Sequence, residues 1–156
     1  MMTGIRRKGR EYALKMLYSL RMPVKDIHAV MDDFWANFRF SDDVLGEALD
    51  DAEQKVPSEA RRFAEQILVG IVDNREIVDA EIRQHAKNWS LDRMARVDIS
   101  ILRLGIYELL FCSDTPSSVV LNEAVEIAKR YGTAESPSFV NGILDQVARA
   151  HGKRSK

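Results

Sequence analysis

The sequence predicts an all-α protein, and three observations carry this prediction. Apolar residues recur at i, i+3 and i+4 in several separate segments, as they do in helices that bury one face. No segment alternates apolar and polar residues with the period of two that a half-buried strand requires. Residues 94–112 are apolar on more than one helical face, and one stripe there consists of Ile99, Leu102, Ile106 and Leu110. We therefore expect a central buried helix over about residues 93–112, surrounded by other helices.

This central segment is not expected to cross a membrane, because it is too short and is interrupted by Asp98, Arg103 and Glu108. Gly105 lies in its interior, where a glycine costs ~1 kcal/mol relative to alanine. Close approach of a neighbouring helix would offset that cost, so we expect such an approach at Gly105.

Proline, glycine and short polar side chains delimit the other helices. The expected ranges are about 8–21, 24–38, 41–49, 57–89, 117–131 and 136–150. Asp73 and Asn74 indicate a kink or break inside the long 57–89 segment. The sequence therefore predicts about seven helices.

Several residues are typical of helix ends. Ser90 or Asp92 is expected to cap the central helix. Gly132 stands where a C-terminal glycine stop belongs. Ser136 and Pro137 are expected to be the N-cap and the first residue of the last helix.

Length and cysteine content fit a cytoplasmic protein. A chain of 156 residues corresponds to one domain and buries enough surface to need no disulfide or metal. The single cysteine, Cys112, allows no internal disulfide, which fits a reducing compartment. The N-terminus has no apolar run of the kind found in secretory signals. We expect a flexible basic arm at residues 1–7, one helical domain at 8–150 and a basic tail at 151–156.

The net charge of −1 conceals a strong asymmetry. Seven of the 23 Lys and Arg lie in residues 1–10 and 151–156, which hold no acid. The 16 that remain stand against all 24 Asp and Glu, so residues 11–150 carry a net charge of −8. A basic end on an acidic body indicates two kinds of partner, although charged termini are also commonly solvated tails.

The four cations at the start of the first helix are anomalous. They are Arg6, Arg7, Lys8 and Arg10. The helix dipole favours acids in the first turn by ~0.3–1 kcal/mol each, so these cations do not serve helix stability. One explanation is an anionic ligand such as RNA or DNA phosphate, and the other is a solvated tail.

No local motif for catalysis or metal binding is present. His28, His85 and His151 lie far apart in the sequence and have no metal-ligand spacing. Cys112, at the end of an apolar helix, is interpreted as a small buried hydrophobe rather than a nucleophile. Glycine-rich phosphate-binding motifs are also missing. We therefore expect a binding module without a cofactor or metal, while residues distant in sequence could still converge into a catalytic site.

Four blocks of the sequence follow one another in order: RRKGREYALKMLYSL, ILRLGIYEL, NEAVEIAKRYG and FVNGILD. Together they resemble the NusB family of bacterial transcription antitermination factors, whereas residues 22–88 match only in general character. The resemblance implies an all-helical fold of two packed bundles without catalytic activity. It also implies binding to single-stranded boxA RNA of nascent ribosomal transcripts. The implied partners are NusE, a small-subunit ribosomal protein, and the antitermination complex on RNA polymerase.

The resemblance also assigns candidate site residues. The candidates for RNA binding are Arg6, Arg7, Lys8, Arg10, Lys129, Arg130, Glu135, Ser138 and Phe139. Lys129 and Arg130 are included on charge alone, and Phe139 is interpreted either as a base-stacking residue or as part of the core. Tyr18 and Asp98 match positions that the family uses toward its protein partner, although Tyr18 is equally interpreted as a core residue.

Two alternative functions remain open at this point. In the first, the chain is a protein–protein adaptor: its acidic face, with nine acids between residues 26 and 53, binds a basic partner while the arm is idle. In the second, it is a NusB-like domain associated with ribosomal RNA methyltransferase activity, for which the chain is expected to lack a cofactor-binding domain. The sequence does not fix the oligomeric state, and a homodimer is one possibility.

Overall fold

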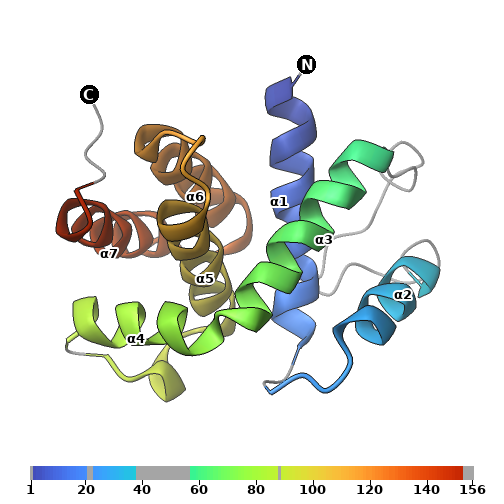
Figure 1. The fold of residues 1–156 in the computed structure, drawn as a ribbon. Coiled ribbons are helices and arrows are strands. Elements are labelled where there is room, and N and C mark those ends of the chain that lie inside the picture. Colours follow the sequence, from blue (N-terminus) through green and yellow to red (C-terminus); the bar gives the residue numbers. More distant parts are fainter. Residues whose placement is uncertain (1, 21–22, 38–56, 88, 153–156) are drawn as a thin grey trace. The chain divides into compact units, whose positions relative to one another are not determined.

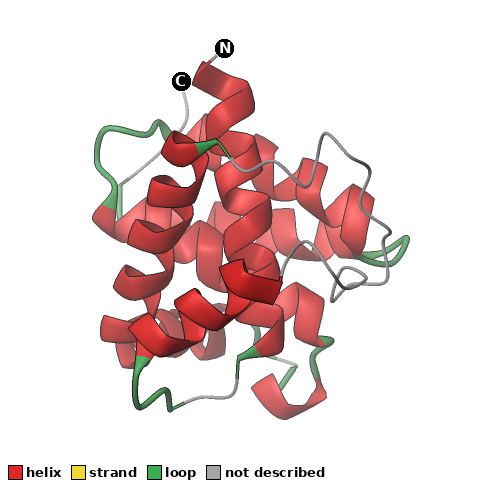
Figure 2. Ribbon diagram, turned by 90° about the vertical axis from the view of Figure 1, so that its right-hand side faces the viewer, coloured by secondary structure: helices red, strands yellow, loops and turns green. Residues whose placement is uncertain are grey.

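The computed structural model describes residues 2–20, 23–37, 57–87 and 89–152, and every regular element in these ranges is a helix (Figures 1 and 2). The all-α prediction is therefore confirmed. The chain divides into two compact units, Met1–Val72 and Asp73–Lys156. The helix expected over residues 41–49 lies outside the described residues. Within them, no helix has the length and apolar character needed to span a membrane.

In the described part of the first unit there are three helices. They are α1 (Met2–Ser19), α2 (Ile27–Asn37) and α3 (Ser58–Asp73). The expected start of the first helix near residue 8 is wrong, because α1 begins at Met2. Arginine and lysine are good helix formers, so the basic segment is helical. Because α1 begins four residues before Arg6, the cations lie beyond its first turn, where the helix dipole acts, and the expected conflict with the dipole is not present.

Aromatic contacts join these three helices. Tyr12 of α1 meets Trp35 of α2 edge to face, with ring centroids 5.4 Å apart. The indole Nε1 of Trp35 donates a hydrogen bond to Glu65 Oε2 of α3 at 2.8 Å. A buried indole N–H usually needs such a partner, so this bond fixes α2 against α3. At its own start, α2 is capped by Asp26 Oδ1, which accepts the backbone N–H of Ala29 at 3.2 Å.

The second unit is arranged around one helix. Its elements are α4 (Arg75–His85), the short 3-10 helix η1 (Leu91–Arg93), α5 (Arg96–Phe111), α6 (Ser117–Tyr131) and α7 (Ser136–Ala150). The central helix α5 packs against α4, α6 and α7, as Figure 1 shows. This confirms that the apolar 94–112 segment is surrounded by helices.

Gly105 marks a close approach of two helices in this unit. A Cβ placed on Gly105 of α5 would lie 2.6 Å from Cδ1 of Leu144 on α7. Leu144 is fully buried. The expected close approach of a neighbouring helix at Gly105 is therefore confirmed, and α7 is that neighbour.

An ion pair joins α4 to α5 beside this core. The guanidinium of Arg103 contacts the carboxylate of Asp79 through two hydrogen bonds of 2.9 and 3.0 Å. Both side chains are mostly buried, at 17% and 8% relative exposure. Such a bidentate pair fixes the rotation of α4 relative to α5.

The ends of the helices differ from expectation in detail. The break predicted at Asp73 and Asn74 is confirmed, since α3 ends at Asp73 and α4 begins after Asn74. The expectation that Ser90 or Asp92 caps the central helix is wrong: Ser90 precedes η1, and Ala95 is the residue before α5.

The turn between α6 and α7 is held by Ser136. Its hydroxyl accepts the backbone N–H of Thr133 at 2.9 Å, and Glu135 rather than Ser136 is the N-cap of α7. Gly132 follows the last residue of α6, as expected. Its φ is −97°, so this position does not require glycine for a left-handed backbone conformation. A Cβ on Gly132 would lie 2.5 Å from Ser136, and glycine therefore leaves room for that side chain.

Candidate nucleic-acid interface

The basic residues of α1 differ in how far they reach solvent. Arg7 is exposed, Arg6 and Lys8 are half-buried, and Arg10 retains only 3% exposure. The guanidinium carbons of Arg6 and Arg10 lie 5.1 and 5.4 Å from the ring centroid of Phe63 on α3. Arg6 and Arg10 are therefore held by an aromatic ring, in the manner of cation–π contacts.

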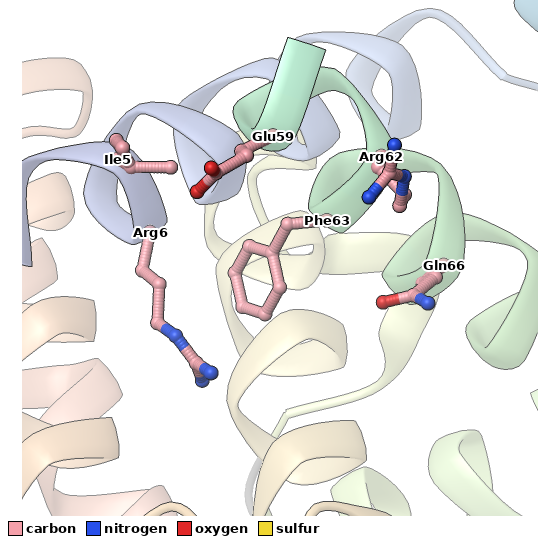
Figure 3. A pocket seen from close by; sticks show the side chains of 6 residues that line it. All are labelled: Ile5, Arg6, Glu59, Arg62, Phe63 and Gln66. Carbon is pink, nitrogen blue, oxygen red and sulfur yellow. The ribbon is translucent and has the colours of Figure 1, made fainter. Parts of the chain in front are cut away.

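Beside this contact, α1 and α3 form a cleft of about 250 Å³. Its lining, shown in Figure 3, consists of Ile5, Arg6, Glu59, Arg62, Phe63 and Gln66. Two cations, one acid, one amide and two apolar side chains therefore meet in a single recess. The sequence alone does not single out the α3 residues, because Phe63 fits the apolar stripe of its helix, a pattern that is typical of a core residue.

Gly9 makes the approach of α1 to α3 possible. A Cβ on Gly9 would lie 2.7 Å from Phe63 Cδ2 and 3.0 Å from the backbone oxygen of Ala60. The backbone oxygen has little freedom to move aside, so any larger residue would push the two helices apart. The cleft therefore depends on glycine at this position.

The second unit gathers the other predicted RNA-binding residues around one turn. Lys129 and Arg130 occupy the last turn of α6, whereas Glu135, Ser138 and Phe139 lie at the start of α7. All are exposed except Phe139, which is half-buried. Lys129 pairs with Glu126 at 3.2 Å, and the guanidinium carbon of Arg130 lies 5.1 Å from the Tyr131 ring centroid. The helix dipole also favours cations in the last turn of α6, so their position has a structural explanation as well.

Trp89 adds an aromatic side chain to this turn. It meets Phe139 edge to face, with ring centroids 5.9 Å apart, and 52% of its surface is exposed. The exposed cations Lys87 and Arg93 lie within four residues of it in the chain. Sequence reasoning missed this residue because Trp89 and Phe139 are far apart in the chain and only the fold brings them together.

The two predicted partner-binding residues belong to different units. Tyr18 lies half-buried in α1, and Asp98 lies half-buried in the first turn of α5. The carboxylate oxygen Oδ1 of Asp98 is buried and has no hydrogen-bond partner among the described residues. The helix dipole stabilises an acid in the first turn of a helix, so Asp98 also has a structural reason to lie at this position.

The surroundings of Tyr107 on α5 shift the pKa of its phenol. Burial raises the pKa of Tyr107 above its ordinary value of 10.0, and negative charge at Cys112, Asp73 and Glu108 raises it further. Cys112 itself is half-buried. Within the described ranges, His, Cys, Asp and Glu nowhere gather into a group that could hold a metal ion.

The geometry so far defines a class: an all-helical protein whose candidate surfaces combine cations with aromatic rings. The family profile of NusB matches residues 7–149. The chain belongs to the NusB family, which confirms the resemblance found in the sequence, and its function is that of a transcription antitermination factor.

Relatives of known name match the chain over nearly its full length. The transcription antitermination protein NusB of Syntrophotalea carbinolica is 54% identical over 149 residues, covering 96% of this chain and 95% of the relative. Its counterpart in Geobacter sulfurreducens is 43% identical over 145 residues, covering 93% and 94%. The agreement thus spans both units described above.

Solved structures share the fold. T. maritima NusB matches with a TM-score of 0.72 and 35% identity, covering 92% of this chain and 90% of that one. A structure of the antitermination factors NusB and NusE in complex with dsRNA matches with a TM-score of 0.73, covering 96% and 99%. At 24% identity, the latter match bears on the fold alone.

Proposed function

We propose that this chain is a non-catalytic, RNA-binding antitermination factor that holds single-stranded boxA RNA of nascent ribosomal transcripts. The observation that carries this proposal is the group of four cations on α1, in which Arg6 and Arg10 are four residues apart, a spacing at which like charges destabilise a helix. A group of like charges with no benefit to the helix is well explained by an anionic ligand. Phosphate contacts supply most of the affinity in such complexes.

The α1 cations take different roles in this proposal. Arg7, the most exposed, and the half-buried Arg6 and Lys8 contact phosphates. The predicted phosphate contact of Arg10 stays a prediction, and its burial against Phe63 gives it less reach than the other three. Its main contribution is to hold the ring that Arg6 also covers.

The turn between α6 and α7 supplies the second RNA contact. Phe139 stacks on a base, and Glu135 and Ser138 lie one turn or less away from it on exposed positions. Lys129 and Arg130 contribute positive charge at the end of α6. An aromatic side chain beside cations is the usual arrangement for gripping single-stranded RNA.

The protein partner in this proposal is NusE, and the assembly acts on RNA polymerase in the cytoplasm. Tyr18 and Asp98 contact that partner. The acidic body of the chain suits a basic ribosomal protein. The buried Oδ1 of Asp98, which has no hydrogen-bond partner in the part of the chain that the structure describes, supports a contact there. When the partner is absent, the residues that would contact it are available to a second copy of the chain, which would allow a homodimer.

The salt dependence of RNA binding tests the role of α1. For single strands, log affinity falls with log salt by about 0.7 per phosphate neutralised, so four α1 contacts predict a slope of about −3. Replacing Arg6, Arg7 and Lys8 with alanine is expected to flatten the slope by about 2. Fluorescence anisotropy of a labelled boxA strand over a salt series measures it.

A matched control removes the same charge elsewhere. The variant Lys153→Ala, Arg154→Ala, Lys156→Ala also loses three cations, but from the C-terminal tail. Its slope is expected to stay near that of the unaltered protein. An unchanged slope in the α1 variant, or an equal loss in both variants, would remove α1 from the site.

A second experiment tests the partner. Binding of boxA RNA and of a scrambled strand is measured with and without NusE. Tighter boxA binding that increases with NusE is expected, and linkage requires RNA to tighten NusE binding by the same factor. NusE binding that is indifferent to RNA would favour the adaptor function instead. Methyl transfer to ribosomal RNA would contradict the proposal.

A further inference from the structure

The cleft between α1 and α3 has no role in the function proposed so far beyond the contribution of Arg6. We infer that it binds one nucleotide of the RNA strand, which makes α3 part of the RNA-binding surface. This inference rests on the proposed function and adds to it a defined pocket with a preference for the base.

The polarity of the lining matches a nucleotide better than a simple anion. Arg6 and Arg62 offer guanidinium groups, which match the geometry of phosphate oxygens. Figure 3 shows Arg6 on one side of Phe63 and Arg62 with Gln66 on the other. A phosphate site alone would be opposed by the carboxylate of Glu59, so the ligand must also carry hydrogen-bond donors.

The base edge provides those donors. Glu59 can only accept hydrogen bonds when ionised, whereas the amide of Gln66 both donates and accepts. Cytosine and adenine present an exocyclic amino group to such acceptors. The N–H of uracil lies between two carbonyl oxygens that a carboxylate repels. The cleft is therefore expected to prefer an amino-bearing base over uracil.

Phe63 is already ordered for this role. Two guanidinium groups contact its ring, and Gly9 allows the α1 backbone to lie against it. Together with Ile5 it gives the cleft an apolar lining for the base and sugar.

The neighbouring arginine on α3 has a different role. Arg61 pairs with Glu65 at 3.5 Å, and its guanidinium carbon lies 5.0 Å from the ring centroid of Trp35. Arg62, one residue later, lines the cleft and makes no ion pair within the described part of the chain. Both are exposed. The pair therefore offers two chemically identical substitutions, one in the cleft and one outside it.

The experiment compares Arg62→Ala with Arg61→Ala in the full chain, using labelled oligocytidylate and oligouridylate. Arg62→Ala is expected to weaken binding of both strands about tenfold and to flatten the salt slope by about 0.7, whereas Arg61→Ala changes neither appreciably. Glu59→Gln is expected to reduce the preference for oligocytidylate over oligouridylate severalfold. Gln66→Ala serves as a second variant in the cleft, and circular dichroism confirms that each variant folds.

The outcomes separate the cleft from the wider proposal. Salt-dependent RNA binding that responds equally to the Arg61 and Arg62 variants would overturn the proposed role of the cleft in RNA binding. The proposed phosphate contacts of α1 would not be affected. Absence of RNA binding by the unaltered protein at low salt would overturn both. Excess cytidine monophosphate is expected to compete with the strand more effectively than uridine monophosphate, and equal competition by the two would overturn the preference for an amino-bearing base.

Discussion

The substitution Gly105→Ala tests the packing of α5 against α7 quantitatively. Alanine improves helix propensity by about 1 kcal/mol. Its Cβ, however, would lie 2.6, 2.8 and 3.3 Å from Cδ1, Cδ2 and Cγ of Leu144, which is fully buried. Overpacking of a core costs about 1–3 kcal/mol. The net expectation is a loss of about 1 kcal/mol in the free energy of unfolding.

Gly142 on α7 is the matched control for this substitution. It is exposed and helical, and a Cβ placed there meets no atom within 4 Å. Gly142→Ala is therefore expected to raise the free energy of unfolding by about 0.5–1 kcal/mol. The difference between the two variants, about 1–3 kcal/mol, isolates the contact with Leu144.

Urea unfolding followed by far-UV circular dichroism measures both variants. The double variant Gly105→Ala, Leu144→Ala gives a further check, because removing the Leu144 side chain makes room for the new methyl group. It is expected to be more stable than the sum of the two single effects predicts. Equal stabilisation by alanine at positions 105 and 142 would refute the close approach of α7.

Three further predictions follow from individual side chains. Asp79→Leu is expected to lower the free energy of unfolding by about 2–3 kcal/mol, because it leaves the mostly buried guanidinium of Arg103 unpaired. The double variant Asp79→Leu, Arg103→Met should recover most of this loss, as measured by urea unfolding. Because burial raises the pKa of Tyr107, the tyrosine of the unfolded chain ionises before that of the folded protein as the pH rises past 10.0. The free energy of unfolding should therefore fall between pH 10.0 and the raised pKa. The variant Tyr107→Phe should have a flatter curve of unfolding free energy against pH in that range. RNA should quench the fluorescence of the Trp35→Phe protein, in which Trp89 is the remaining tryptophan, and a lack of quenching would exclude Trp89 from the RNA contact.

The sequence predicted the helices well where local signals mark their ends. The range 117–131 matches α6 because Pro116 precedes it and Gly132 follows it. The close approach at Gly105 was also predictable, since a glycine inside a long apolar helix needs a compensating contact. Helix starts without a capping side chain were less predictable: α1 begins at Met2 and α5 at Arg96, and neither start has a strong cap in the sequence.

The cleft could not be predicted, because it depends on rotation about the axis of α3. Adjacent residues on a helix point about 100° apart, so Arg61 and Arg62 face different surroundings. Only the packing of α1 and α2 on α3 determines which arginine meets Trp35 and which lines the cleft. The contact between Trp89 and Phe139 was hidden for the same reason, since it depends on how the loop after α4 folds onto α7.

The contact of Arg6 with Phe63 has a thermodynamic consequence for ligand binding. A free arginine side chain carries about 2 kcal/mol of rotamer entropy, part of which is lost when it grips a phosphate. Arg6 is already restrained by the aromatic ring before any ligand arrives. Ligand binding by Arg6 therefore loses less side-chain entropy than binding by an arginine that is not restrained beforehand. Calorimetry of RNA binding should accordingly show that the contribution of Arg6 has a small unfavourable entropy.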